Sequence, residues 1–100
     1  MAGVASWYGA AFEGKRMANG CRFHRHALTA ASRALPLGER VRVRLRGKSV
    51  IVPVTDLGPY ISGRVIDLSE AAAARLGMIR SGLANVEIER LGGTLPRCRR

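Results

Sequence analysis

Two neighbouring segments decide the fold, Val54-Thr55-Asp56-Leu57-Gly58-Pro59-Tyr60 and Gly63-Arg64-Val65-Ile66-Asp67-Leu68-Ser69. Together they predict a buried strand, a Gly-Pro turn, a second strand and the start of a helix. Asp56 stands where the first strand ends and the turn begins. A carboxylate there either accepts hydrogen bonds from turn amides or takes part in chemistry, so its role decides whether the protein is an enzyme.

The alternation of apolar and polar residues predicts further strands on both sides of these segments. It is clearest over 40–46, where Val41, Val43 and Leu45 alternate with arginines, and Gly47-Lys48-Ser49 is expected to form the turn that follows. The expected strands cover 4–8, 28–31, 40–46, 50–54, 64–68 and 84–91. About six short strands do not fit a doubly wound sheet, so the sequence predicts a mainly β protein, a small closed barrel.

One short helix is expected over 71–76. Either Asp67 or Ser69 caps its start, and Glu70 stands three residues after Asp67, as in a capping box. Gly77 is the expected C-terminal stop.

Length and composition indicate one domain over 1–93, followed by a basic tail over 94–100. The net charge of +10 favours an anionic partner, although a solvated basic surface without a specific partner fits as well. No apolar run approaches the ~20 residues of a membrane span. The first residues lack the pattern of a signal peptide, so we expect either a removed leader or delivery without one.

The two cysteines, Cys21 and Cys98, either form one disulfide or remain free thiols. His24 and His26 form an H-x-H pair in the long loop over 9–26, but Cys21 is the only soft donor nearby. We therefore expect no metal site and no cofactor.

Several short motifs follow one another along the chain in a characteristic order. They are Ala5-Ser6-Trp7-Tyr8-Gly9, Phe12-Glu13-Gly14, Ala18-Asn19-Gly20, Leu28-Thr29-Ala30-Ala31, Leu35-Pro36-Leu37-Gly38 and the two segments quoted first. In this order and spacing the chain resembles the rare lipoprotein A (RlpA) domain, a double-psi β-barrel related in fold to the expansins. The resemblance implies a six-stranded double-psi β-barrel with one short helix. It also implies a lytic transglycosylase, which cleaves the MurNAc–GlcNAc bond of peptidoglycan without water and leaves a 1,6-anhydro sugar.

The family pattern supplies a Glu, a His and an Asp, and this chain keeps one of the three. Asp56 matches the Asp, but Cys21 stands at the position of the Glu and Ser32 at that of the His. Leu57 replaces the usual Arg beside the Asp. A thiol is a poor acid toward a sugar oxygen, and a serine cannot replace a titrating imidazole. The resemblance therefore carries over the fold without the complete catalytic set.

Two carboxylates are our candidate catalytic residues, Asp56 and, as a substitute acid in the long loop, Glu13. Each has a structural alternative: Asp56 as a turn residue and Glu13 as a solvated loop residue. Asp67 is interpreted as a helix cap, and either His24 or His26 could replace the missing imidazole. The candidate substrate-binding residues are Trp7, Tyr8, Asn19, Tyr60 and Arg64.

Arg40, Arg42, Arg44 and Arg46 are expected on the outer face of the barrel. They form either a solvated face or a basic stripe for carboxylates of peptide stems or for teichoic-type polymers. Nucleic acid is disfavoured because the stripe lacks interleaved aromatic residues.

Two functions remain open. The first is a peptidoglycan-directed lytic domain in the cell envelope, periplasmic or secreted if a leader was removed. The second is a non-catalytic glycan-binding or structural module with protein assembly partners, for example a virion-associated subunit of a phage tail tip.

Overall fold

The computed structural model describes residues 1–98, whose backbone forms short strands joined by turns, one 3-10 helix and one α-helix. In chain order the elements are β1 (Ala2–Tyr8), η1 (Ala10–Phe12), β2 (Ala30–Ala31), β3 (Arg40–Leu45), β4 (Lys48–Asp56), β5 (Arg64–Ser69), α1 (Glu70–Leu76) and β6 (Ala84–Gly92). Within residues 1–98, no helix is both long enough and apolar enough to cross a bilayer.

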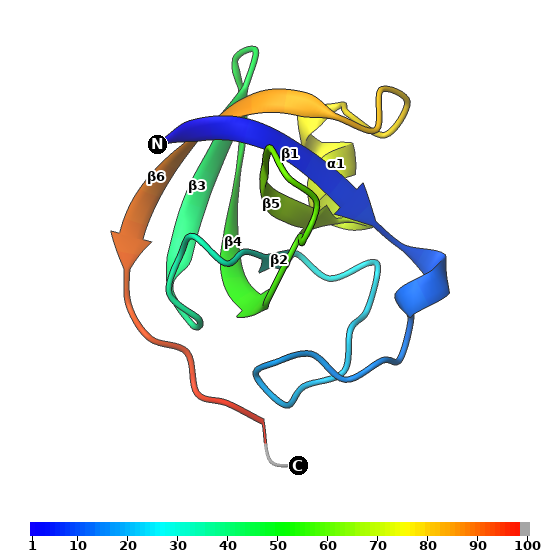
Figure 1. Cartoon of the computed structure of the whole chain (residues 1–100), viewed down its shortest axis with the longest axis vertical. Helices are drawn as coiled ribbons and strands as arrows, with labels where there is room; N and C mark the ends of the chain where they lie inside the picture. The colour runs from blue at the N-terminus through cyan, green and yellow to red at the C-terminus, as the bar shows by residue number, and fades with distance from the viewer. Residues whose placement is uncertain (99–100) are drawn as a thin grey trace.

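The six strands close into a barrel in the order β1-β5-β2-β4-β3-β6, with β6 returning to β1 (Figure 1). The pairs β1–β5 and β2–β4 are parallel, and the other four pairs are antiparallel. Closure satisfies the backbone groups that an open sheet would leave along its edges. The predicted mainly β, six-stranded barrel with one short helix is confirmed.

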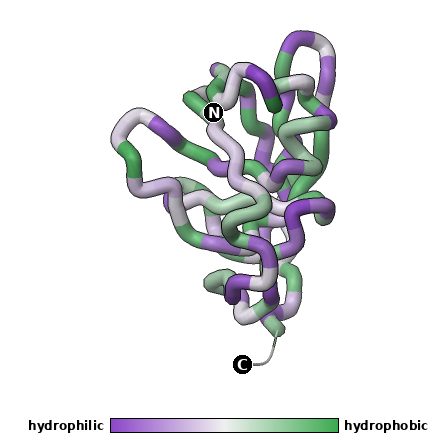
Figure 2. The backbone as a smooth tube through the Cα atoms, turned by 90° about the vertical axis from the view of Figure 1, so that its right-hand side faces the viewer, coloured by the Kyte–Doolittle hydropathy of each residue, from purple (hydrophilic) through white to green (hydrophobic). Residues whose placement is uncertain are grey.

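The core consists of small and branched side chains that alternate with polar residues along the strands. Figure 2 shows this alternation as hydrophobic and hydrophilic bands that follow one another along the backbone. The most deeply buried side chains of the core include Val41, Val43, Val52, Val54, Ile66 and Leu68. Each such side chain contributes roughly 1.5–3 kcal/mol when it leaves water. The predicted inward face of β3 is confirmed for Val41 and Val43.

The turn between β3 and β4 begins earlier than the sequence predicted. Leu45 pairs with Lys48, and the two residues between them, Arg46 and Gly47, have φ values of 49° and 79°. A two-residue turn of this kind requires positive φ at both positions, which matches the twist of the flanking strands. Lys48 and Ser49 therefore belong to β4, and Arg46 lies in the turn rather than on the arginine face of β3.

The start of α1 corrects a second expectation. The Ser69 hydroxyl accepts a hydrogen bond from the Ala72 amide at 3.3 Å, so Ser69 is the cap. Strand β5 continues up to Ser69, so Asp67 lies within the strand, where its carboxyl group accepts a hydrogen bond from the Ser6 hydroxyl. The capping box between Asp67 and Glu70 is not formed. Gly77, at φ 73°, ends the helix as predicted.

A C-terminal strap, residues 93–98, crosses the lower end of the barrel in Figure 1, where the loop after η1 also lies. The Leu95 amide donates to the Gly38 carbonyl at 3.0 Å, and the Cys98 amide donates to the Asn19 carbonyl at 2.9 Å. Cys98 forms a disulfide with Cys21. Of the two alternatives for the cysteines, the disulfide is therefore the one found. Residues 99 and 100 of the predicted tail lie outside the described residues.

Candidate functional site

A β-bulge aligns two carboxylates on one face of the barrel. Strict alternation along β4 would place Asp56 on the inner face with Val52 and Val54. The register between β2 and β4 shifts by one residue, so that Ala30 pairs with Val54 but Ala31 pairs with Asp56. Such bulges redirect side chains and occur often beside active sites.

The same register continues across two more strands. Ala31 pairs with Asp67 on β5, and Asp67 pairs with Ser6 on β1. Residues in one register position share a face of the sheet. We call this set, Asp56, Ala31, Asp67 and Ser6, the acidic row.

Asp56 has both a structural and an electrostatic role. Its Oδ1 atom accepts hydrogen bonds from the amides of Ala18 and Leu57, each at 2.9 Å. These bonds hold the loop and the following turn, as the structural alternative predicted. Its charge also raises the pKa values of Asp67 and of Tyr8. A second carboxyl group therefore lies within electrostatic reach of Asp56.

Asp67 is the functional candidate that sequence reasoning missed. Burial raises the pKa of its carboxyl group above the ordinary value, and the charge of Asp56 adds to this rise. A hydrogen bond from the Ser6 hydroxyl to Oδ1, at 3.0 Å, and the charge of Arg64 oppose it without cancelling it. The sequence does contain a pattern that points to Asp67: it alternates with Ile66 and Leu68, as expected for an outward-facing residue of a strand.

Tyr8 completes this part of the surface. Its ring stacks on Phe23, with 4.4 Å between the centroids, and meets Phe12 edge to face. Its hydroxyl oxygen is buried and has no hydrogen-bond partner among residues 1–98. Burial, followed by the charges of Asp56 and Asp67, raises the pKa of Tyr8, so the hydroxyl keeps its proton. An unpaired buried donor beside two carboxyl groups is costly unless a ligand or water satisfies it.

Cys21 and Ser32, at the positions where the resemblance leads us to expect Glu and His, make structural contacts. Cys21 is bonded to Cys98, so it has no thiol that could act as an acid. Ser32 is fully buried, and its hydroxyl donates to the Val65 carbonyl and accepts from the Ala34 amide. Its own amide donates to the Asp56 carbonyl at 3.0 Å.

Asn19 and Arg64 differ in their relation to the acidic row. The buried Asn19 connects three segments: its amide donates to the Thr55 carbonyl, its Oδ1 accepts from the Cys21 amide, and its carbonyl accepts from Cys98. Half-buried Arg64 acts electrostatically on Asp67 and lies at the start of β5. Asn19 therefore holds the loop, whereas Arg64 acts on the row through its charge.

Glu13 lies on the exposed loop and is held there by neighbours. Its carboxylate accepts from the Arg25 amide at 2.8 Å and contacts His24 Nδ1 at 2.9 Å. The Arg25 hydrogen bond, followed by the His24 contact, lowers the pKa of Glu13. His26 is engaged by the Arg25 side chain at 3.3 Å. These contacts keep Glu13 ionised, which does not favour it as a proton donor.

The remaining aromatic candidates differ in exposure. Trp7 alternates with Tyr8 on β1, packs against the core and donates its indole N–H to the Ile79 carbonyl at 3.3 Å. One member of the Trp7–Tyr8 pair, Trp7, is therefore a partly buried residue that packs against the core. Tyr60 is 70% exposed on the turn after Asp56, and the Arg33 guanidinium lies 4.8 Å from its ring centroid.

Two cavities flank the fold, and neither contains Asp56 or Asp67. One, of about 300 Å³, lies under the strap and includes Asn19 and Thr55. The other, of about 770 Å³, lies at the opposite end of the barrel. We assign the candidate site to the surface that carries these two carboxyl groups and not to either cavity, because charge and burial determine what the side chains can do. Residues 1–98 contain no group of three His, Cys, Asp or Glu side chains arranged to hold a metal ion.

The sequence matches the family model described as lytic transglycolase over residues 1–88. The probable endolytic peptidoglycan transglycosylase RlpA of Synechocystis sp. is 55% identical over 89 residues, which covers 87% of this chain and 28% of that protein. The endolytic peptidoglycan transglycosylase RlpA of Pseudomonas aeruginosa is 52% identical over 91 residues, covering 89% of this chain and 27% of that protein. The chain thus spans little more than a quarter of the length of these relatives.

Solved structures share the barrel. The Streptomyces papain inhibitor superposes with a TM-score of 0.71 at 26% identity and covers 88% of this chain and 92% of its own. The Clavibacter michiganensis expansin superposes with a TM-score of 0.70 at 22% identity over 94% of this chain and 51% of its own, which shows a common fold alone. From the matched family model, the closely similar relatives and the barrel, the chain belongs to the lytic transglycolase family of double-psi β-barrel domains.

Proposed function

We propose that this domain acts on peptidoglycan glycan strands as a lytic transglycosylase, with the acidic row as its reaction centre. The observation that carries the proposal is the alignment of Asp56 and Asp67 on one face of the barrel. Two carboxyl groups in different environments can divide the roles needed to break a glycosidic bond. The relatives named as peptidoglycan transglycosylases support the substrate class.

In the proposed reaction, Asp67 is the acid. Its carboxyl group gives a proton to the GlcNAc oxygen as the bond from that oxygen to C1 of MurNAc breaks. The Asp56 carboxylate stabilises the positive charge that develops at C1 and the ring oxygen. The 6-hydroxyl oxygen of MurNAc then bonds to C1, and its proton returns to Asp67. The products carry a 1,6-anhydro end, and no water is consumed.

The environment of Asp67 supports the acid role. Burial keeps its pKa raised, so a larger fraction of the carboxyl group is protonated near neutral pH than for an exposed aspartate. The exposed ring of Tyr60 offers a stacking surface to a sugar. Arg64 is proposed to orient Asp67. Glu13 is the alternative acid, and its pairing with His24 argues against it.

A second function is supported by the two substituted positions. Because Cys21 and Ser32 are committed to structural contacts, the domain could bind glycan without cleaving it. In that case it would be a wall-binding or structural module, alone or as a subunit of a larger assembly such as a phage tail tip. Both functions place the domain in contact with the cell wall, in the envelope or on a virion.

The test is digestion of purified sacculi, and of glycan strands stripped of stem peptides, in water enriched in ¹⁸O. Mass spectrometry of the soluble products should find 1,6-anhydro-MurNAc ends without ¹⁸O. Ends that carry ¹⁸O would indicate hydrolysis and contradict the lytic reaction. If no product forms but the protein sediments with sacculi in salt, the binding function is supported. If it neither cleaves nor binds, both functions are wrong.

A further inference from the structure

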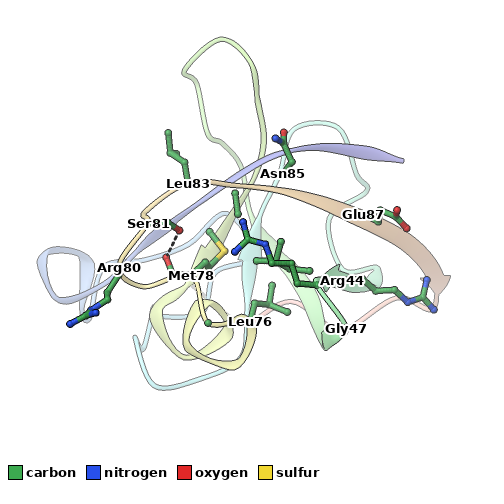
Figure 3. A pocket seen from close by; sticks show the side chains of 13 residues that line it. Arg44, Gly47, Leu76, Met78, Arg80, Ser81, Leu83, Asn85 and Glu87 are labelled. Atoms are coloured by element: carbon green, nitrogen blue, oxygen red, sulfur yellow. Dashed lines mark hydrogen bonds between the residues drawn. The ribbon is translucent and has the colours of Figure 1, made fainter.

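The larger cavity lies at the end of the barrel that carries the β3–β4 turn (Figure 3). It is formed by this turn, the segment after α1 and the start of β6. Lys48 and Asp56 mark the two ends of the nine-residue strand β4. At about 3.3 Å per residue, roughly 26 Å of strand separates the turn from Asp56. The cavity is therefore a surface separate from the acidic row.

The charges around this cavity are mostly positive. Three arginines line it, Arg44, Arg46 and Arg80, against one acidic residue, Glu87. Arg44 shares Glu89 with Arg42, at 3.0 Å and 2.7 Å. Arg46 and Arg80 are exposed and form no ion pair with any residue in 1–98. Two guanidinium groups at this cavity are thus available to an anionic partner.

Apolar side chains lie between the charges. Leu76 and Met78 are buried at the cavity, while Leu83 is 45% exposed. In Figure 3, Arg80 lies on one side of the cavity and Arg44 and Glu87 on the other, with Leu76 and Met78 between them. None of the described residues that line the cavity is aromatic.

We propose that this cavity binds a short acidic peptide segment of a protein partner, one that carries apolar side chains between its carboxylates. Carboxylates pair with Arg46 and Arg80, and an apolar side chain covers the exposed Leu83. A volume of about 770 Å³ accommodates a few residues of such a segment. Sugars and nucleic-acid bases stack on aromatic rings, which the lining lacks, and a bare anionic polymer would leave the exposed Leu83 uncovered.

The probe is a fluorescein-labelled octapeptide of alternating glutamate and leucine, titrated with the protein and followed by fluorescence anisotropy. The double variant Arg46→Gln/Arg80→Gln should bind it about tenfold more weakly, because two ion pairs at the cavity are lost. The matched control Arg40→Gln/Arg97→Gln removes the same charge from exposed arginines outside the cavity and should change affinity less than about twofold. Leu83→Ser should weaken binding of this peptide but not of its glutamate–serine counterpart.

Thermal unfolding of each variant establishes that it is folded before it is titrated. Equal losses in the two double variants would mean adsorption by net charge and would overturn the proposal. So would equal affinity for the two peptides, or no binding at millimolar protein. Tighter binding of a single-stranded oligonucleotide through Arg46 and Arg80 would assign the surface to nucleic acid instead.

Discussion

Removal of the Cys21–Cys98 disulfide should strongly lower the stability of this domain. The bond joins the loop after η1 to the C-terminal strap, two segments without regular strand pairing to the barrel. It also holds Asn19, whose carbonyl accepts from the Cys98 amide and whose Oδ1 accepts from the Cys21 amide. In the double variant Cys21→Ala/Cys98→Ala the two segments are no longer linked, so the unfolded chain gains conformational freedom.

The magnitude follows from the length of the closed loop. The two cysteines are 77 residues apart in the sequence. A loop of this length restricts the unfolded chain by about 15 cal/mol/K, or about 4.5 kcal/mol at room temperature. For a domain of this size, each kcal/mol corresponds to about 4–8 °C in Tm, so the expected decrease is roughly 20–35 °C.

Urea unfolding followed by circular dichroism measures the difference directly, with the oxidised wild type, the reduced wild type and the double variant compared. The reduced wild type and the double variant should agree, and a reductant should leave the double variant unchanged. A loss below about 1 kcal/mol with equal m values would refute the chain-entropy reasoning. An altered m value would mean that the unfolded state itself had changed in compactness.

Three further predictions concern single side chains. Ser69→Ala removes the cap of α1 and should lower the free energy of unfolding by about 1–2 kcal/mol in urea titrations, with Ser62→Ala, an exposed serine, as a near-neutral control. Tyr8→Phe removes a buried hydroxyl that lacks a partner, so stability should be unchanged or rise by up to about 1 kcal/mol in urea titrations; a clear loss of stability would show that the hydroxyl is satisfied in the free protein. Burial raises the pKa of Asp67, so the folded state binds more protons than the unfolded chain, and the stability contributed by this group falls as pH rises from its ordinary pKa through the raised one. Asp67→Asn should therefore gain stability relative to the wild type as pH rises through that window, and a constant difference across pH would contradict the raised pKa.

The strands and the barrel class follow from short-range pattern, but the bulge does not. Along β4 the sequence reads Val52, Val54, Asp56 at alternate positions, which gives Asp56 the phase of a core residue. Asp56 takes an outward position because β4 has one extra residue opposite Ala30 and Ala31. These two alanines belong to β2, a strand that precedes Asp56 by some 25 residues. Pairing between distant segments is not encoded in local alternation.

Asp67 illustrates the opposite error. Its spacing to Glu70 fits a capping box, which favours a helix cap, whereas the period-two pattern around it favours a strand. The structure follows the strand pattern because Ile66 and Leu68 are fully buried, and their burial fixes Asp67 on the outer face. The disulfide was undetermined for another reason: residues 93–98 have no periodic pattern from which their position could be predicted.

The most direct test of the acidic row is the rate of 1,6-anhydro product formation by two matched variants, Asp67→Asn and Glu13→Gln. Each exchanges one carboxylate for an amide of the same shape. Asp67→Asn should lower the rate at least about a hundredfold, as for loss of a general acid, while Glu13→Gln should retain most of it. The opposite order, or an unchanged rate in Asp67→Asn, would contradict the assignment of the acid to the row.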